Sequence, residues 1–346
     1  MIRGVDWVKR RRSTLAMLLV TLAVLLVLWL LVRAVGVTRG RAFSLEGKVV
    51  VVTGAASGIG RRLTQKVFKE TTDVVLALLD IDTEALKALQ TELLHSQDAE
   101  EGSKRVIIYE CNVADHRSVE ATIARVVDNV APKHIGVLIN NAGIVMGKSL
   151  EDLTPEQIQK TFAVNTLAHF WTVRNALPSM KKASEAMLVT LSSVMGMTSS
   201  AGLTDYCASK AAVNAFHESL RLELWRDEVT SIRTLLVCPA AVDTGMFAGV
   251  LSADDWALKI SRFCIPMLSE SEVVDAIYRS IRRGDELLVS CFSGWRGVAL
   301  SWAPVISRML PVPVYDVVVR LGGGLNGMDT FVGRHNSSDK DKVKVN

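Results

Sequence analysis

The stretch KVVVVTGAASGIG, residues 48–60, decides the fold that the chain is expected to adopt. Its first half, KVVVVTG, is apolar and β-branched without alternation, as in a strand that is buried on both faces of a parallel sheet. Its second half places Gly54, Gly58 and Gly60 in a turn before a helix. Glycine lets backbone N–H groups approach a pyrophosphate there, and the N-terminus of the helix favours the negative charge. The stretch therefore predicts a strand, a turn and a helix that together bind a dinucleotide.

The same alternation of strand and helix continues along the chain. Further buried strands are expected at residues 74–80, 106–113, 135–143, 186–193 and 231–239. Helices are expected at residues 59–69, 83–94, 119–130, 155–180 and 206–225, the fourth preceded by a capping box at 154–157. Strands that alternate with helices form a parallel sheet covered on both faces. The predicted fold class is α/β, a doubly wound parallel sheet of Rossmann-like type in a single domain at residues 47–290.

An uncharged apolar segment, Ser13 to Val32, precedes this domain. As a helix it spans roughly 30 Å, which is the thickness of the hydrocarbon core of a bilayer. The segment is longer than the apolar region of a cleaved signal peptide, and it has no polar face that would suit a helix of the domain. The sequence therefore predicts a transmembrane or membrane-anchor helix at residues 1–35, joined to the domain by a basic linker at residues 36–46.

Charges and cysteines bear on the compartment and on the partners. Lys and Arg are nearly balanced on the two sides of the anchor, so the positive-inside rule leaves the orientation open. The five cysteines are scattered and form no CxxC motif, which favours unpaired thiols in a reducing compartment and a cytosol-facing domain. No Cys and His have the spacing of metal ligands, so no metal is expected. The net charge of +4 comes from the membrane end of the chain, so no nucleic-acid surface is expected.

Asp80 stands at the end of the second predicted strand. An acidic side chain about 20 residues after the glycines binds the adenosine ribose 2′-OH and repels a 2′-phosphate. The glycine-rich turn itself has no Lys or Arg, although Arg61 and Arg62 follow it directly. The pattern favours NAD over NADP as the cofactor. A turn residue that caps the next helix is the simpler interpretation of Asp80, and it stays open.

The stretch DYCASKAAV, residues 205–213, places Tyr206 and Lys210 one helical turn apart. Taken alone, such a pair is most often part of a solvated helix surface. Oxidation of an alcohol by hydride transfer requires a group that accepts the hydroxyl proton. A tyrosine has a pKa of about 10 in water, and a neighbouring ammonium favours the phenolate and lowers this pKa. The pair can therefore serve as an acid–base group.

Taken together, the motifs resemble the short-chain dehydrogenase/reductase family over about residues 47–290. The matching motifs are TGxxxGxG at 53–60, NNAG at 140–143, the asparagine of TFAVNTLAHF, the second serine of LSSVMG, YxxxK, and Pro239 with Thr244. The resemblance implies four catalytic residues: Tyr206 as the acid–base group, Lys210 to tune it and hold the nicotinamide ribose, Ser193 to bind the substrate oxygen, and Asn165 to orient a water that links Lys210 to solvent. The cofactor-binding residues that it implies are Thr53, Gly54, Ser57, Gly58, Ile59, Gly60, Asp80, Asn112, Val113, Asn140, Ala142, Gly143, Tyr206, Lys210, Pro239, Val242 and Thr244.

Two residues depart from the family pattern. Asn112 stands where the family often has an aspartate that contacts adenine, and its amide oxygen can still accept a hydrogen bond from the adenine amino group. Ala240 stands where the family usually has a glycine, which restricts the backbone near the nicotinamide. Cofactor binding is expected to survive both departures. Ser192 is the less suitable of the two adjacent serines, because its spacing from Tyr206 fits the family pattern less well.

Within the family, the chain looks most like the membrane-anchored branch of retinol dehydrogenases and 17β-hydroxysteroid dehydrogenases of the endoplasmic reticulum and lipid droplets. The supporting stretches are the anchor, GKSLEDLT at 147–154, VNTLAHFWTVRNALPSM at 164–180 and GMDTFVGR at 327–334. The resemblance implies an NAD-dependent oxidoreductase of lipid metabolism, with all-trans-retinol and retinal as the leading substrate pair. A steroid 17β-hydroxyl comes second, and a fatty or sphingoid carbonyl third. The alternative from another class is a non-catalytic membrane or lipid-droplet interaction protein, which has no need of all four catalytic side chains.

Residues 291–346 form an apolar, membrane-proximal segment and a polar tail. Charges and prolines interrupt residues 294–324 too often for a second span, so this part either packs on the domain or lies in the membrane interface beside the pocket. Side chains that could line an apolar pocket are Met195, Met197, Leu203, Met246 and Phe247. They favour a long hydrophobic alcohol as the substrate. The sequence leaves the oligomeric state open, including a homo-oligomer.

Overall fold

The computed structural model describes residues 41–95, 105–250, 267–292 and 294–333. The chain divides into two compact units, residues 1–42 and 43–346, and every helix and strand below belongs to the second. The predicted anchor, Ser13 to Val32, lies outside the described residues. Within the described ranges, no helix is both long and apolar enough to cross a membrane.

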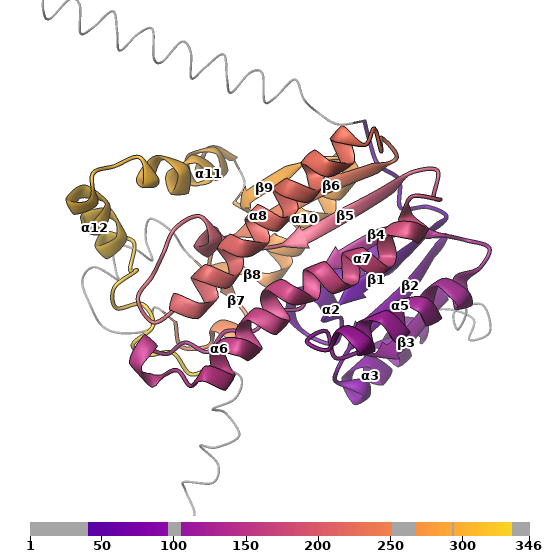
Figure 1. Ribbon diagram of the computed structural model, residues 1–346, viewed down its shortest axis with the longest axis horizontal. Helices are drawn as coiled ribbons and strands as arrows, with labels where there is room; N and C mark the ends of the chain where they lie inside the picture. Colours follow the sequence, from indigo (N-terminus) through magenta and orange to yellow (C-terminus); the bar gives the residue numbers. More distant parts are fainter. Residues whose placement is uncertain (1–40, 96–104, 251–266, 293, 334–346) are drawn as a thin grey trace, which may run out of the picture. The chain divides into compact units, whose positions relative to one another are not determined.

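In the described part of the chain, seven parallel strands form one sheet (Figure 1). Its strands, in spatial order, are β3 (Val106–Glu110), β2 (Val74–Asp80), β1 (Lys48–Thr53), β4 (Ile135–Asn140), β5 (Ala186–Leu191), β6 (Ile232–Pro239) and β9 (Leu287–Ser290). Every pair of neighbours runs parallel, so the predicted doubly wound sheet is confirmed. The strand order changes direction between β1 and β4. In such sheets, ligands bind at this point, beside the carboxyl ends of the strands.

A layer of helices covers each face of the sheet. One layer contains α2 (Gly58–Glu70), α3 (Thr83–Leu94) and α10 (Glu270–Arg283), and the other contains α5 (His116–Val130), α7 (Ala168–Met180) and α8 (Thr204–Arg226). Val50 and Val52 of β1 pack against the first layer, whereas Val49 and Val51 pack against the second. All four valines are at most 1% exposed. Burial on both faces is the reason that β1 has no polar side.

The helix predicted at 155–180 is divided by a π-helical turn. Its first part, α6 (Pro155–Phe162), begins with the predicted capping box of Thr154 and Gln157. The π-helical turn Ala163–Leu167 follows, and α7 then continues the chain. Such turns interrupt the regular hydrogen-bond pattern of a helix and occur often at functional sites. The apolar periodicity of the sequence is nearly unchanged by so short an interruption, which explains why one helix is predicted.

Within the sheet and its two helix layers, two elements, β9 and α10, lie outside the predicted ones. β9 has four residues, LLVS, of which only Ser290 is buried, so neither alternation nor a buried apolar run indicates a strand there. α10 has clear end signals, a capping box at Ser269 and Glu272 and a left-handed Gly284 with φ 71°. The remaining short elements are β7 (Val242–Asp243), β8 (Leu268–Ser269), and the 3₁₀ turns Leu150–Asp152, Val194–Gly196 and Gly245–Phe247.

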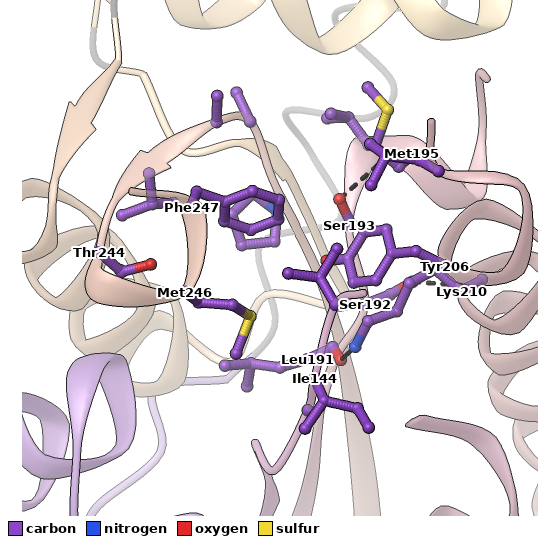
Figure 2. A pocket seen from close by; sticks show the side chains of 18 of the residues that line it. Ile144, Leu191, Ser192, Ser193, Met195, Tyr206, Lys210, Thr244, Met246 and Phe247 are labelled. Carbon is purple, nitrogen blue, oxygen red and sulfur yellow. Dashed lines mark hydrogen bonds between the residues drawn. The ribbon is translucent and has the colours of Figure 1, made fainter. Parts of the chain in front are cut away.

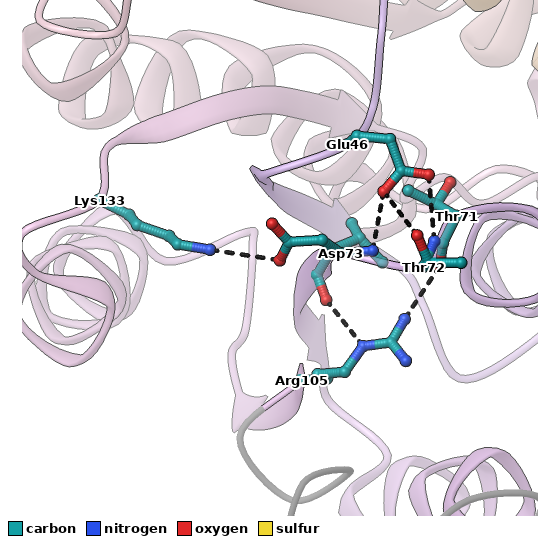
Figure 3. A network of polar contacts seen from close by, with 7 residues as sticks. Glu46, Thr71, Thr72, Asp73, Arg105 and Lys133 are labelled. Atoms are coloured by element: carbon teal, nitrogen blue, oxygen red, sulfur yellow. Dashed lines mark hydrogen bonds and ion pairs between the residues drawn. The ribbon is translucent and has the colours of Figure 1, made fainter.

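The end of the predicted linker is fixed to the domain. Phe43 and Leu45 are each 1% exposed and belong to the core beside α2 and α10. The carboxylate of Glu46 accepts hydrogen bonds from the backbone N–H of Asp73, at 2.8 Å, and from that of Thr72 (Figure 3). These backbone donors lower the pKa of Glu46. Residues 43–46 therefore pack as the first part of the domain, while the rest of the predicted linker lies mostly outside the described residues.

A pair of C-terminal helices, here called the C-terminal hairpin, packs on the loop after β5. The hairpin consists of α11 (Gly294–Arg308) and α12 (Val312–Leu321). Arg308 Nε donates to the carbonyl of Met197 at 2.9 Å, and the Tyr315 hydroxyl lies 3.0 Å from Thr198 Oγ1. Packing on the domain is thus observed for one side of residues 294–324. The exposed apolar side chains of the hairpin are Val298, Trp302, Val305, Ile306, Met309, Val312, Val314, Val317, Val318 and Leu321.

Candidate active site

A cavity of about 1060 Å³ opens at the carboxyl ends of the strands. Its walls come from the segments that follow β1 to β6 and from the C-terminal hairpin. Sites for one small ligand have roughly 300–1,000 Å³, so this cavity has room for a dinucleotide and part of a second molecule. The predicted site residues that line it are Gly54, Ser57, Gly58, Ile59, Asp80, Asn112, Val113, Ala142, Gly143, Ser193, Tyr206, Lys210, Pro239, Val242 and Thr244. The other predicted site residues, which lie behind this lining, are Thr53, Gly60, Asn140 and Asn165.

The glycine-rich turn between β1 and α2 is tightly packed. Gly54 and Gly58 have φ values of 65° and 53°, a backbone region that favours glycine. A Cβ on Gly60 would lie 2.1 Å from the carbonyl oxygen of Gly54, so no larger residue fits there. Asn141 holds the turn, because its Nδ2 donates to the carbonyls of Thr53 and Gly54, each at 3.0 Å. The turn is thus a preformed cradle at the N-terminus of α2, held by Asn141 and by Asp80, which accepts from the N–H of Ala56.

Asparagine 141 is the site residue that the sequence prediction misses. The predicted neighbour, Asn140, is 2% exposed, and its Oδ1 accepts a hydrogen bond from Thr172 on α7 at 2.8 Å. Asn141 instead lines the cavity and bonds the glycine-rich turn. One pattern in the sequence could have identified Asn141. The buried run of β4 ends at residue 140, and side chains alternate along a strand, so the next side chain leaves the sheet.

Asp80 connects the turn after β2 to the glycine-rich turn. Its Oδ2 accepts from the backbone N–H of Ala56 at 2.9 Å, and its Oδ1 from that of Asp82 at 3.1 Å. The cap of α3 is Asp82, whose side chain accepts from the N–H of Ala85. Asp80 is therefore not the capping residue that the simpler interpretation proposes, although it does stabilise the turn. Its carboxylate also lines the cavity.

The two arginines that follow the glycine-rich turn are engaged outside the cavity. Arg61 Nη2 lies 2.5 Å from Glu92 Oε2 on α3, and Arg62 pairs with Glu270 on α10. Neither arginine lines the cavity. Asp80 consequently faces the cavity without a guanidinium that would suit a 2′-phosphate.

Asn112 lies on the cavity wall at the end of the third strand. Its Oδ1 accepts from the backbone N–H of Ala114 at 3.1 Å. An amide oxygen has two lone pairs, so it can accept a second hydrogen bond from a ligand. At the opposite end of the cavity, Ala240 has no positive φ, in contrast to Ser290 and Cys291 of the neighbouring segment. Alanine is therefore accommodated at position 240 without backbone strain.

Tyr206, Lys210 and Ser193 meet in one wall of the cavity (Figure 2). Tyr206 and Lys210 lie on consecutive turns of α8 and are 5% and 4% exposed. Ser193 follows β5, and its hydroxyl lies near enough to lower the pKa of the phenol, while its Oγ accepts from the N–H of Met195 at 3.1 Å. Lys210 Nζ lies 5.9 Å from the centre of the Tyr206 ring and donates to the carbonyl of Leu191 at 3.0 Å. The adjacent Ser192 donates to the carbonyl of Lys210 at 3.2 Å instead, so Ser193 is the serine whose hydroxyl affects the pKa of the phenol.

Burial controls the proton affinities of this pair. It raises the pKa of Tyr206 to about 12, against the smaller lowering effect of the Ser193 hydrogen bond. It lowers the pKa of Lys210 to about 8. The expectation that Lys210 lowers the pKa of Tyr206 is therefore not met in the protein alone, because the loss of solvation outweighs the charge of a lysine whose ammonium is itself disfavoured.

Asn165, in the π-helical turn, supports the wall that holds Tyr206 and Lys210. Its Oδ1 accepts from the N–H of Ile144 at 2.8 Å, and its Nδ2 donates to the Ile144 carbonyl and to Ser209 Oγ. Ser209 Oγ in turn donates to the carbonyl of Tyr206 at 2.7 Å. A Cβ on Gly143 would lie 3.5 Å from Asn165 Oδ1 and 3.7 Å from Lys210 Nζ. The side chain of Asn165 thus links the segment after β4 to α8 beside Lys210.

The far side of the cavity is apolar. Of the side chains expected to line it, Met195, Leu203, Met246 and Phe247 do so, whereas Met197 does not. The rings of Phe247 and Tyr206 meet edge to face with centres 5.9 Å apart, across the cavity in Figure 2. The C-terminal hairpin and the segment after it contribute further wall residues outside the predicted set, including Leu300, Ala303, Val319 and Met328.

The described residues show no competing inorganic site. They contain no group of His, Cys, Asp and Glu that could hold a metal ion. Four of the cysteines, Cys111, Cys207, Cys238 and Cys291, are free and buried. Cys264 lies outside the described residues. The unpaired thiols expected from the sequence are thus confirmed for these four.

Comparisons with known proteins agree with this geometry. A model of the short chain dehydrogenase family matches residues 48–255. Retinol dehydrogenase 10 of Homo sapiens is 38% identical over 244 residues, which are 64% of this chain and 70% of that protein. Retinol dehydrogenase 10-A of Xenopus laevis is 36% identical over 242 residues, with the same shares of 64% and 70%. A solved short chain dehydrogenase/reductase from Burkholderia phymatum, in complex with NAD, has a TM-score of 0.61 at 24% identity over 80% of this chain and 96% of that one.

Proposed function

Because the chain belongs to the short-chain dehydrogenase family, we propose that it is a membrane-bound oxidoreductase that transfers a hydride between NAD(H) and a lipophilic alcohol or carbonyl. All-trans-retinol and retinal are the proposed substrate pair. Family membership and similarity to retinol dehydrogenases establish an oxidoreductase that acts on CH–OH groups. The observation that carries the proposal further is the buried Tyr206, which lines a cavity with an apolar far side together with Ser193 and Lys210.

The proposed chemistry assigns one step to each side chain. Tyr206 accepts the hydroxyl proton when the alcohol is oxidised and returns it when the carbonyl is reduced. Ser193 donates a hydrogen bond to the substrate oxygen and so stabilises the charge that develops there. Lys210 holds the nicotinamide ribose and favours the phenolate by its charge. The bound nicotinamide supplies the acceptor or donor of the hydride.

Two features support a dinucleotide, and NAD in particular. The turn at Gly54, Gly58 and Gly60 leads into the N-terminus of α2, where a pyrophosphate is favoured. Asp80 lines the cavity, while both nearby arginines pair with carboxylates elsewhere. A carboxylate without a nearby cation accepts from the ribose 2′-OH and repels a 2′-phosphate.

Three features support a lipophilic substrate delivered by a membrane. Met195, Leu203 and Phe247 make the substrate side of the cavity apolar. The C-terminal hairpin lines the same cavity with one side and exposes Val, Ile, Met, Trp and Leu side chains on the other. The sequence adds the anchor, Ser13 to Val32. We propose a lipid bilayer as the partner of the exposed apolar side chains of the hairpin, because a pocket for a membrane-soluble alcohol is expected to open toward lipid.

A substrate screen tests the proposal. The full-length protein, reconstituted in phospholipid nanodiscs, is supplied with NAD or NADP and with all-trans-retinol, a 17β-hydroxysteroid or a long-chain fatty alcohol. We expect NAD-dependent oxidation of all-trans-retinol at a higher kcat/KM than that of the other two alcohols. A preference for the steroid would replace the proposed substrate. Cofactor binding without turnover of any lipid alcohol would contradict the enzymatic proposal and favour a membrane interaction protein.

A further inference from the structure

The segment after the C-terminal hairpin, residues 322–333, crosses the substrate side of the cavity and is here called the C-terminal strap. It contains GMDTFVG, the stretch that resembles the retinol dehydrogenases without a role in the chemistry. Gly324 O accepts from the N–H of Ala201 at 2.8 Å, and Val332 N donates to the carbonyl of Ala248 at 2.8 Å. The strap is thus bonded at one end to the loop after β5 and at the other to the loop after β6.

The strap inserts Met328 beside the catalytic tyrosine. Met328 is 8% exposed and forms one apolar cluster with Leu203, Tyr206 and Cys207. It also lines the cavity. Gly202, at φ 72°, makes room for it, because a Cβ there would lie 3.0 Å from Met328 Cβ. The methionine side chain therefore lines the cavity within the apolar cluster that contains Tyr206, where it occupies space that an uncovered cavity would leave to the substrate.

The strap is held in place on the far side of Met328 as well. The Phe331 ring lies so close to Gly147 that a Cβ there would be 2.2 Å from it. Thr330 Oγ1 donates to the carbonyl of Gly249 at 2.6 Å. Gly249, with φ 85°, allows this approach, since a Cβ would lie 2.1 Å from the Thr330 carbonyl oxygen. With both flanks of the strap fixed, Met328 has little freedom to withdraw from the cavity.

We propose that Met328 is a specificity-determining residue that narrows the cavity beside Tyr206 and selects primary over secondary alcohols. The carbon that bears the hydroxyl must lie within reach of the phenol. In a secondary alcohol this carbon carries a second carbon substituent, which needs space next to the phenol where Met328 packs. In a primary alcohol the same position holds only hydrogen. This inference rests on the proposed function and adds to it the shape of the preferred alcohol.

Two alcohols of equal carbon number, dodecan-1-ol and dodecan-2-ol, isolate this effect. The readout is the ratio of kcat/KM for the primary over the secondary alcohol, because the fraction of active enzyme cancels in the ratio. Each misplaced methyl or methylene group changes such a ratio by roughly 10–200-fold. We expect the wild-type ratio to exceed 1 and to fall at least about tenfold in Met328→Ala. Met328→Leu, of similar volume, is expected to keep a ratio close to that of the wild type.

Met180→Ala is the matched control. Met180 is a methionine at 1% exposure, packed between helices away from the cavity, so its loss lowers stability without reshaping the site. A thermal melt of each variant confirms that the protein is folded. We expect Met180→Ala to lower the melting temperature and to leave the ratio unchanged. A ratio that changes equally in Met180→Ala and Met328→Ala would overturn the inference, because the effect would be one of general destabilisation.

A binding measurement separates this inference from the proposed function. Displacement of fluorescent all-trans-retinol from the NADH complex by each dodecanol reports selectivity without turnover. If the wild type turns over no alcohol but binds dodecan-1-ol more tightly, and Met328→Ala removes this preference, the inference stands while the enzymatic proposal fails. A second outcome is that retinol is oxidised while two ratios, that of kcat/KM and that of binding affinity for dodecan-1-ol over dodecan-2-ol, are the same in Met328→Ala as in the wild type. In that case the inference fails and the proposed function stands. Absence of displacement by either dodecanol also overturns it.

Discussion

Tyr206 and Lys210 are buried so completely that solvation, rather than their mutual distance, governs their protonation. Burial raises the pKa of Tyr206 to about 12 and lowers that of Lys210 to about 8, so at pH 7 the phenol is neutral while Lys210 still carries its proton. A positive charge placed beside the phenol, such as an oxidised nicotinamide ring, favours the phenolate. The site therefore suits a tyrosine that gives up its proton only with the cofactor in place.

Replacement of Tyr206 by phenylalanine removes the phenol oxygen and keeps the ring that packs edge to face against Phe247. We expect Tyr206→Phe to lower kcat by roughly 10²–10⁴-fold, the usual contribution of an acid–base group, with cofactor affinity nearly intact. Tyr109→Phe is the control, because the Tyr109 hydroxyl bonds Asn129 outside the cavity. Steady-state kinetics and a cofactor titration make the comparison. Retained activity in Tyr206→Phe would overturn the acid–base assignment.

Asp80 has an observed structural role and a proposed recognition role, and two substitutions separate them. Asp80→Asn keeps an oxygen for the N–H of Ala56 but removes the charge, whereas Asp80→Arg reverses it. We expect the ratio of kcat/KM for NAD over NADP to fall in both variants, and further in Asp80→Arg, because repulsion of the 2′-phosphate is lost. Kinetics with each cofactor provide the test. An unchanged ratio in Asp80→Arg would refute the contact with the 2′-OH.

Residue types could be predicted wherever the chemistry allows few alternatives. The glycines of the first turn, Tyr206 with Lys210, and Ser193 are of this kind, and the cavity brings them together. Asn141 and Met328 could not be predicted in the same way. The role of Asn141 depends on which of two adjacent asparagines leaves the sheet, and that of Met328 on a segment more than a hundred residues away from Tyr206 in the sequence.

Two helices, α7 and α8, bury a histidine each. His169 is 2% exposed and His217 1% exposed. Burial lowers the pKa of His169 to about 3 and that of His217 to about 4. Nδ1 of His169 and both ring nitrogens of His217 lack hydrogen-bond partners among the described residues. Both rings are therefore neutral in the folded protein at pH 7.

These buried rings predict a loss of stability in acid. An unfolded histidine has a pKa of about 6.5, so below this pH the unfolded chain binds protons that the folded protein excludes. The stabilisation is complete above pH 6.5 and is lost as the pH falls toward the folded pKa of about 3. For His169 alone the loss at pH 5 is about 2 kcal/mol, because each pH unit contributes about 1.4 kcal/mol.

Urea denaturation at pH 7 and pH 5 measures this effect. We expect His169→Leu to reduce the difference in unfolding free energy between the two pH values, because the variant has one titrating ring fewer. His95→Leu, at the exposed end of α3, is expected to leave the difference unchanged. If the unfolding free energy of His169→Leu falls as much between pH 7 and pH 5 as that of the wild type, groups other than His169 cause the loss of stability in acid.

Elements that bury apolar residues in long runs were the most predictable. α3 has the predicted bounds 83–94 and β2 the predicted bounds 74–80. β3, β4 and β5 end at residues 110, 140 and 191, earlier than predicted, because the residues after them turn away to line the cavity. The π-helical turn and β9 depend on contacts with other elements, so local sequence patterns carry little information about them.

For the molecule as a whole, membrane attachment has two proposed sources, the anchor and the C-terminal hairpin. We expect deletion of residues 1–35 to release most of the protein from phospholipid vesicles in a flotation assay, because the longest apolar segment is gone. Any remaining binding is expected to depend on the hairpin and to disappear when Val312→Asp and Val317→Asp are added, since these side chains are 71% and 55% exposed.

Leu222→Asp is the matched control for these aspartates. Leu222 is an aliphatic residue at 48% exposure on α8, remote from the hairpin in sequence. We expect it to leave vesicle binding of the shortened protein unchanged. Equal losses with Leu222→Asp and with the hairpin substitutions would indicate that added negative charge, rather than the hairpin, determines the binding.

The two-sided C-terminal hairpin has a consequence for how the enzyme is supplied. If the hairpin contacts lipid as proposed while it also lines the cavity, a hydrophobic alcohol is expected to pass from the acyl chains to Tyr206 without dissolving in water, and the aldehyde to return by the same path. The quantity that sets the reaction rate is then the mole fraction of alcohol in the bilayer, not its bulk molarity. Diluting the substrate with inert phospholipid would slow turnover even when the total amount of substrate per millilitre is constant.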